Sequence, residues 1–400
     1  MTLKHCIHLS LGLLALQAAA PAAAAEADGW TANLRYRHEA VDDEAFARDA
    51  AADTLRLRLG WSRALAHGFS TGFEGEGVAE LGDRFNSGAN GETAYPAVPD
   101  ARALEINQAW LRWRGERAGG TLGRQRLAFD NHRFVGNVGW RQNEQTFDGL
   151  SADATLRDGL VLRYAWLDRV HRVFGDEARD PLARERRLDS HLLNLAWQGA
   201  GGSLVGYGYW HEDQDVAAAS TRTLGLRWTG QRAFGQAGFG WTLEAANQQD
   251  HADNPNATDA DYLLVEPSLS ARGLTWKLGW EQLGGDGRTA FQTPLATLHA
   301  FNGWADKFLV TPANGLEDRY ASVSGKFGSG RLDDKLAWTL AWHDLQSDRG
   351  SLDYGHEWNA SLAFPLPAGF SGLVKLADYR SDGFARDTRK LWLQLERTWP

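Results

Sequence analysis

The chain has 400 residues and a formal net charge of −9, with 44 glycines, 18 tryptophans, one cysteine and one methionine. A mean hydropathy of −0.43 excludes a bundle of transmembrane helices, and the acidic balance disfavours nucleic acid as a partner.

The N-terminus has the order of a secretory signal peptide. Lys4 precedes an apolar run over residues 9–16, and alanines at 23–25 end the segment. We therefore expect residues 1–25 to be a signal peptide and residues 26–400 to be one mature domain. Cys6 would leave with the signal, so something other than disulfides must hold the domain together, and a closed ladder of strands would suffice. No other stretch reaches the 18 or so uncharged apolar residues of a membrane helix.

Residues 55–62, 274–281 and 336–343 place leucine and tryptophan on one parity and small, polar or charged residues on the other. Side chains of a strand alternate between its two faces, so each segment has one apolar and one polar face. Large apolar residues on segments of about ten residues are typical of outer-membrane barrels. Lipid-facing and water-facing positions are then predicted as follows: Trp276, Trp280, Trp338 and Trp342 toward lipid, Lys277 and Glu281 toward water.

Counting such segments from Trp30 to Trp399 predicts an all-β fold, a single antiparallel transmembrane β-barrel of about 18 strands. Short turns are expected at 66–68, 199–202 and 271–273, and long loops at 42–52, 83–100, 175–187, 250–259 and 284–315. The last segment carries apolar residues on one face up to Trp399, like the closing strand that the barrel assembly machinery recognises. The expected location is the outer membrane of a Gram-negative bacterium, in contact with its lipid.

Arginines recur two residues apart on the polar parity, in these pairs: Arg35 and Arg37, Arg56 and Arg58, Arg112 and Arg114, Arg124 and Arg126. A charged side chain facing lipid costs about 2–4 kcal/mol at the bilayer midplane, so these arginines are expected to face the lumen.

The predicted turns also pair specific residues. The turn at 66–68 places Trp61 opposite Phe73 on the lipid side and Arg58 opposite Glu76 inside. A turn centred near Ala118 would place Arg112 opposite Arg124, and like charges across strands repel. Either an anion or interleaved acids, with Glu105 and Asp148 as candidates, would have to compensate, and Gln125 would point outward. A mixed-charge lumen that only holds water and an anion-selective constriction both remain open.

One segment carries a family-specific pattern: Gly123-Arg124-Gln125, Phe129-Asp130-Asn131, Arg133-Phe134, Gly136, Trp140-Arg141-Gln142 and Thr146-Phe147-Asp148. The pattern resembles the alginate export family of outer-membrane porins. The resemblance implies an 18-strand barrel with a narrow electropositive constriction that passes an anionic polysaccharide such as alginate, or a related uronate or small anion. It also implies that Arg124, Arg133, Arg141 and Asp148 lie at or near the constriction.

The sequence contains only weak matches to catalytic or metal-binding motifs. Residues 68–72 match G-x-S-x-G but enter a strand rather than a helix, and Glu74 with Glu76 fits arginine pairing better than a glycosidase pair. The acidic stretch 250–261 lacks calcium-loop spacing, and no metal motif is found. The sequence thus favours a passive channel with no cofactor or catalytic residue. The alternatives are an outer-membrane barrel enzyme and a secreted carbohydrate-binding β-protein.

Overall fold

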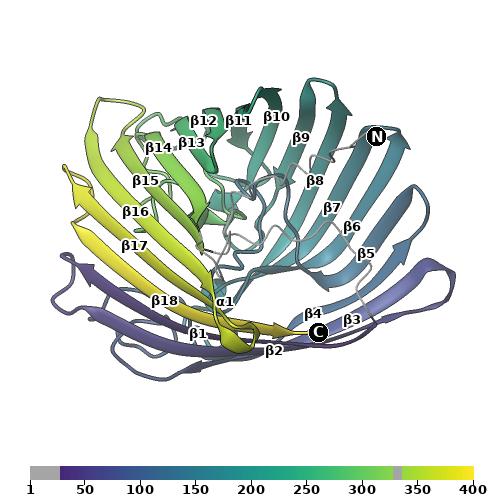
Figure 1. Ribbon diagram of the computed structural model, residues 1–400, viewed down its shortest axis with the longest axis horizontal. Coiled ribbons are helices and arrows are strands. Elements are labelled where there is room, and N and C mark those ends of the chain that lie inside the picture. The colour runs from purple at the N-terminus through teal and green to yellow at the C-terminus, as the bar shows by residue number, and fades with distance from the viewer. Residues whose placement is uncertain (1–27, 328–335) are drawn as a thin grey trace, which may run out of the picture.

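The structure, a computed structural model, describes residues 28–327 and 336–400, so the predicted signal peptide lies outside the described residues. Eighteen strands form one antiparallel sheet that closes on itself (Figure 1), because β1 (Gly29–Asp43) pairs with both β2 (Ala50–Ala64) and β18 (Thr388–Trp399). The predicted all-β barrel and its strand number are confirmed. Among the described residues, no helix is long and apolar enough to span a membrane.

The other strands follow in chain order: β3 (Phe69–Glu80), β4 (Ala103–Arg114), β5 (Ala118–Gln125), β6 (Thr146–Arg157), β7 (Leu160–His171), β8 (Glu185–Gly199), β9 (Gly202–His211), β10 (Thr221–Phe234), β11 (Ala237–Asp250), β12 (Asp259–Ala271), β13 (Leu274–Leu283), β14 (Leu316–Phe327), β15 (Leu336–Gln346), β16 (Asp353–Pro365) and β17 (Ser371–Ser381). Short helices interrupt the connections: η1 (Ala66–Gly68), α1 (Pro181–Arg184), η2 (Ala217–Ala219), η3 (Leu298–Ala300) and η5 (Pro367–Gly369).

Connection lengths differ between the two ends of the barrel. One end has tight turns, including those predicted near 66–68, 199–202 and 271–273. The other end has long connections, including 81–102, 172–184 and 284–315, which agree with the predicted loops within a few residues. The sequence interpretation missed another long connection, residues 126–145.

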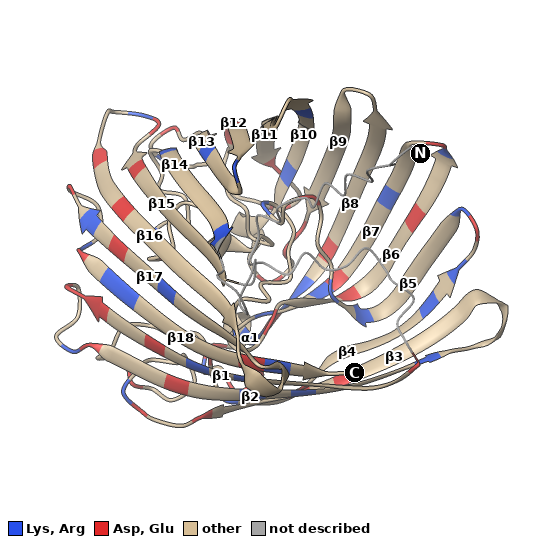
Figure 2. Cartoon of the chain, in the orientation of Figure 1, with Lys and Arg blue, Asp and Glu red and all other residues tan. Residues whose placement is uncertain are grey.

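The two faces of the wall carry the predicted residues. Trp61 lies opposite Phe73 and Arg58 opposite Glu76. Trp276 is 39% exposed on the outer face, whereas the next residue, Lys277, points inward and donates to Glu266 at 2.7 Å. Figure 2 shows Lys/Arg and Asp/Glu bands distributed along the strands of the wall.

The barrel also contains an apolar core that the alternation did not predict. Residues 126–145 and 284–315 fold into the interior (Figure 1) and form what we call the plug. Its two segments bridge at Val135 and Leu295, and the backbone N–H of Gly136 donates to the carbonyl of Leu295 at 2.9 Å. Plug residues such as Phe129 and Phe291 pack with inward-facing wall residues such as Tyr262. Because the alternation reports only the lipid-facing parity, apolar residues on the inner parity gave no separate signal.

The hairpin of β4 and β5 differs from the prediction. Arg112 lies opposite Thr121 and Arg124 opposite Ala109, because the turn is centred near residues 116 and 117 rather than at Ala118. The proposed repulsive pair of Arg112 and Arg124 is therefore wrong. This shift also exchanges the faces of β5, since strand side chains alternate.

Arg124 shares its strand parity with Leu122, which is 56% exposed, so Arg124 lies on the outer face. It pairs there with Asp148 at 2.8 Å. Gln125, expected to point outward, is buried inside and accepts a hydrogen bond from Ser151.

Candidate functional site: the cavity of the lumen

A cavity of about 1280 Å³ lies between the plug and the inner wall. Eight Lys or Arg and six Asp or Glu residues line it within the described ranges. Although the whole chain is acidic, the surface that a solute would meet inside therefore carries more cations than acids.

Two neighbouring strands bring like charges together at this cavity. Arg35 on β1 lies directly opposite Arg56 on β2. Both contact one carboxylate, Glu396 on β18, at 3.0 and 3.3 Å. Two guanidinium groups sharing one carboxylate leave a local excess of positive charge facing the cavity.

The plug contacts the arginines of β1 and β2, which we call the arginine cluster (Arg35, Arg37, Arg56 and Arg58), through backbone carbonyl oxygens. Arg35 donates to the carbonyl of Gly139 at 3.1 Å, and both Arg56 and Arg58 donate to the carbonyl of Gln142 at 3.4 and 3.3 Å. Arg37 donates to the carbonyl of Trp140 and pairs with Asp100 at 3.3 Å. Carbonyl oxygens satisfy the N–H groups but do not neutralise their charge.

A second network joins Arg58 and Arg126 to three carboxylates. Arg58 pairs with Glu76 and, at 3.2 Å, with Glu144, and Arg126 bonds both Glu74 and Glu144. Burial by itself raises the pKa of Glu144, a plug residue, but Arg126 and Arg58 together lower that pKa to about 2. Glu74 and Glu76 are thus arginine partners, as predicted.

Arg133 and Arg141, the arginines of the family pattern that lie in the plug, bind the wall and the second plug segment and do not line the cavity. Arg133 pairs with Glu281 at 2.8 Å and donates to Asn302 at 3.0 Å. Arg141 pairs with Glu39 at 2.8 Å and with Asp306 at 3.1 Å. All these charged side chains are at least nine-tenths buried, so Arg133 and Arg141 hold the plug in place.

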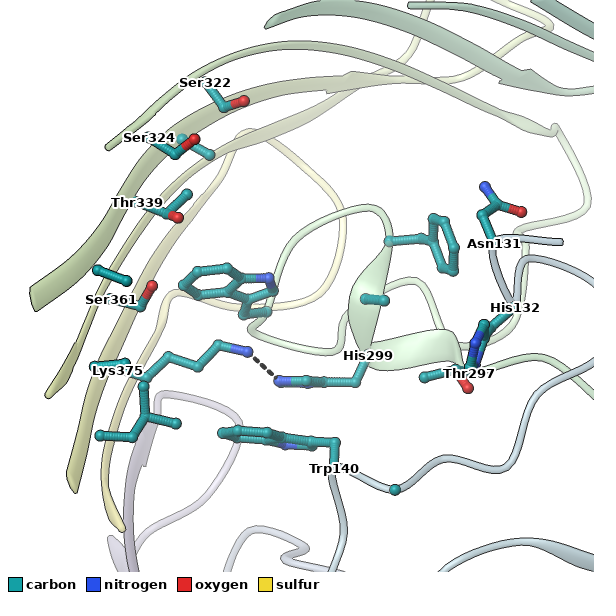
Figure 3. Close-up of a pocket in the computed structure, with 18 of the residues that line it drawn as sticks. Asn131, His132, Trp140, Thr297, His299, Ser322, Ser324, Thr339, Ser361 and Lys375 are labelled. Atoms are coloured by element: carbon teal, nitrogen blue, oxygen red, sulfur yellow. Dashed lines mark hydrogen bonds between the residues drawn. The ribbon is translucent and has the colours of Figure 1, made fainter. Parts of the chain in front are cut away.

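Sequence reasoning missed a cluster around Lys375, an inward-facing residue of β17. Its ammonium lies 3.8 Å from the ring centre of Trp304 and 4.2 Å from that of Trp140, and it donates to His299 at 2.6 Å (Figure 3). Burial lowers the pKa of His299 to about 3, so this imidazole is neutral and accepts from Lys375. Tryptophans on plug segments, away from any lipid-facing strand, were the available signal.

Asp306 joins this cluster to the plug anchors. It contacts His299 at 2.6 Å, Lys390 at 2.8 Å and Arg141 at 3.1 Å, and its side chain is 8% exposed. The Asp306 carboxylate therefore joins three parts of the molecule: the first plug segment through Arg141, the second through His299, and the wall through Lys390 on β18.

The residues proposed from the sequence fall into three groups. Arg35, Arg56, Arg58 and Arg126 line the cavity; Arg37, Arg133, Arg141 and Glu76 are buried in contacts beside it; Arg112, Arg124, Asp148 and Glu105 do not line it. The expectation that Arg124 and Asp148 lie at the constriction is therefore corrected, because their strand parity faces outward. In the part of the chain that the structure describes, no group of three or more His, Cys, Asp or Glu residues could hold a metal ion.

A closed 18-strand barrel with an apolar outer face and a charged cavity inside defines an outer-membrane porin. The chain belongs to the alginate export family, whose sequence model, described as alginate export, matches residues 26–284. Comparison with curated protein sequences gives no match.

Solved structures of other porins share the fold. OccK9 (OpdG) of Pseudomonas aeruginosa aligns with a TM-score of 0.73 at 14% identity, covering 93% of this chain and 98% of that chain. OpdK of the same organism, solved with vanillate, gives 0.69 at 15% identity and covers 92% and 98%. OccK2 (OpdF) of Pseudomonas aeruginosa, solved in complex with glucuronate, gives 0.69 at 15% identity and covers 93% and 97%.

Proposed function

We propose that this porin passes small anionic solutes of the sugar-acid class, of about the size of one uronate. The observation that carries the proposal is the pair Arg35 and Arg56, which face the cavity with one carboxylate between them. Local lumen charge, not the net charge of −9, sets the potential that a permeating ion meets. Glucuronate and vanillate, named with two porins of this fold, each carry one carboxylate.

A second candidate is passage of an intact polyuronate such as alginate, which the family description favours. The plug argues for the smaller solute. It is tied to the wall by buried ion pairs such as Arg133–Glu281 and Arg141–Glu39, so a polymer would have to break several of them to pass.

Reversal potentials in a salt gradient across planar bilayers test the proposal. The variant R35Q/R56Q should lose much of its preference for anions. The control R389Q/R397Q removes two arginines from the outer face of β18 and should keep the preference. Unchanged selectivity of R35Q/R56Q would overturn the anion proposal.

Liposome swelling distinguishes the two solutes. Glucuronate should enter liposomes that contain the porin, whereas a long polyuronate should not enter them. In planar bilayers the polyuronate should instead block the current. Transfer of the polymer would make the second candidate correct. A purified protein that binds uronate but gives no current steps would instead be a binding protein.

A further inference from the structure

Three neighbouring strands of the inner wall, β14 to β16, carry hydroxyl groups in register. Ser324 on β14 lies opposite Thr339 on β15, and Thr339 lies opposite Ser361 on β16. Ser361 in turn lies opposite Lys375 on β17, within the cluster with Trp304 and His299. We call Ser324, Thr339 and Ser361 the hydroxyl row. Figure 3 shows the row and Lys375 along one side of the cavity.

These hydroxyls are uncommitted. Every arginine of the cavity-lining cluster, by contrast, already binds a carboxylate or a plug carbonyl. Ser324, Thr339 and Ser361 all line the cavity, and their hydroxyls bond no described residue. Adjacent inward positions hold small residues, Ala337, Ala341 and Ala363, which themselves do not cover the row.

The spacing and surroundings of the row fit a sugar ring. Neighbouring strands lie about 4.8 Å apart, so the three hydroxyls span roughly 10 Å. That span is about the width of one pyranose with its hydroxyls plus a hydrogen bond of about 2.8 Å on each side. Each can both donate and accept, as sugar hydroxyls require of a partner. Trp304, which is half-buried and lines the same cavity, presents an aromatic surface beside the end of the row, where its ring meets Lys375.

We infer that the hydroxyl row with Trp304 is a binding station for a pyranose ring, whether or not the ring carries a carboxylate. The inference rests on the proposed function in that the cavity must be the solute pathway. It adds that hydroxyl groups, not charge alone, decide which solutes this porin prefers. A carboxylate without hydroxyls would meet the same arginines but would leave the row unpaired.

The test is block of single-channel current by three probes: glucuronate, glucose and cyclohexanecarboxylate, which matches glucuronate in ring size and charge. Wild type should bind glucuronate more tightly than cyclohexanecarboxylate, with measurable block by glucose. The variant S324A/T339V/S361A should weaken block by glucuronate and by glucose about tenfold or more, because three net hydrogen bonds are lost. Block by cyclohexanecarboxylate should stay unchanged.

The control T229V/T242V removes two hydroxyls from inward positions of β10 and β11, away from the row. Its block constants for glucuronate, glucose and cyclohexanecarboxylate should equal those of wild type. Retention of the heat-modifiable gel shift would show that both variants fold. Equal block by glucuronate and cyclohexanecarboxylate in wild type, or wild-type sugar block in the triple variant, would overturn the inference. Either result leaves the reversal-potential test intact, so failure of the hydroxyl row is distinguishable from failure of anion conduction.

Discussion

Replacing Asp306 by Asn should release the plug without unfolding the barrel. The carboxylate of Asp306 is 8% exposed and contacts Arg141, Lys390 and His299. Removing its charge leaves Lys390 buried without an ion pair among the described residues, while Arg141 keeps Glu39. Breaking a buried pair from one side costs about 3–5 kcal/mol. That cost shifts plug docking toward the released state by roughly a hundred- to several-thousand-fold.

Single-channel recording should therefore show larger or longer-lived open levels for D306N than for wild type. Hydrogen exchange of residues 284–315 should speed up, while the closed ladder of strands keeps its protection. Asp286 provides the control within the same loop, because this exposed carboxylate bonds its near neighbours Arg288 and Thr289, whose backbone N–H groups donate to it at 2.7 Å, rather than the wall. D286N should match wild type. Unchanged conductance and exchange in D306N, or loss of the folded barrel, would refute the reasoning.

Three further outcomes are expected. Burial lowers the pKa of His299 from 6.5 to about 3, so the docked plug loses stability as pH falls from 6.5 toward 3, by about 2 kcal/mol at pH 5. The open probability of the channel should therefore rise as pH falls over that range, and H299Q should flatten the rise. A wild-type open probability that does not change with pH would contradict this. R124Q should leave reversal potential unchanged, because Arg124 pairs with Asp148 on the outer face; a shift toward cations would restore Arg124 to the pathway. Single cysteines at Trp276 and Lys277 should differ in labelling by a water-soluble thiol reagent, with the Lys277 position reacting faster; the reverse order would contradict the assigned faces of β13.

The strand pairs predicted from the sequence were correct where the position of the turn was predicted correctly, and wrong where it was not. Trp61–Phe73 and Arg58–Glu76 were predicted correctly because a three-residue turn leaves little freedom in register. Arg112 and Arg124 were mispaired because the next turn is centred only about one and a half residues away from the assumed position. That shift changes the sum of the partner numbers by an odd amount, so it exchanges inner and outer faces of a strand.

The sequence alone determined the barrel and its strand number, because lipid imposes a local period-two pattern on its strands, and it predicted the lipid-facing parity of strands such as β2 and β13 but not that of β5. The cavity was decided only by tertiary structure. Arg133 and Glu281 are 148 positions apart, and Lys375 meets His299 from 76 positions away, so no local pattern connects them. The plug and its apolar core arise because long connections between strands turn inward, where their charged and aromatic side chains find partners on the inner face. Those partners are fixed by barrel closure and strand register, which set the distances between all inward-facing side chains.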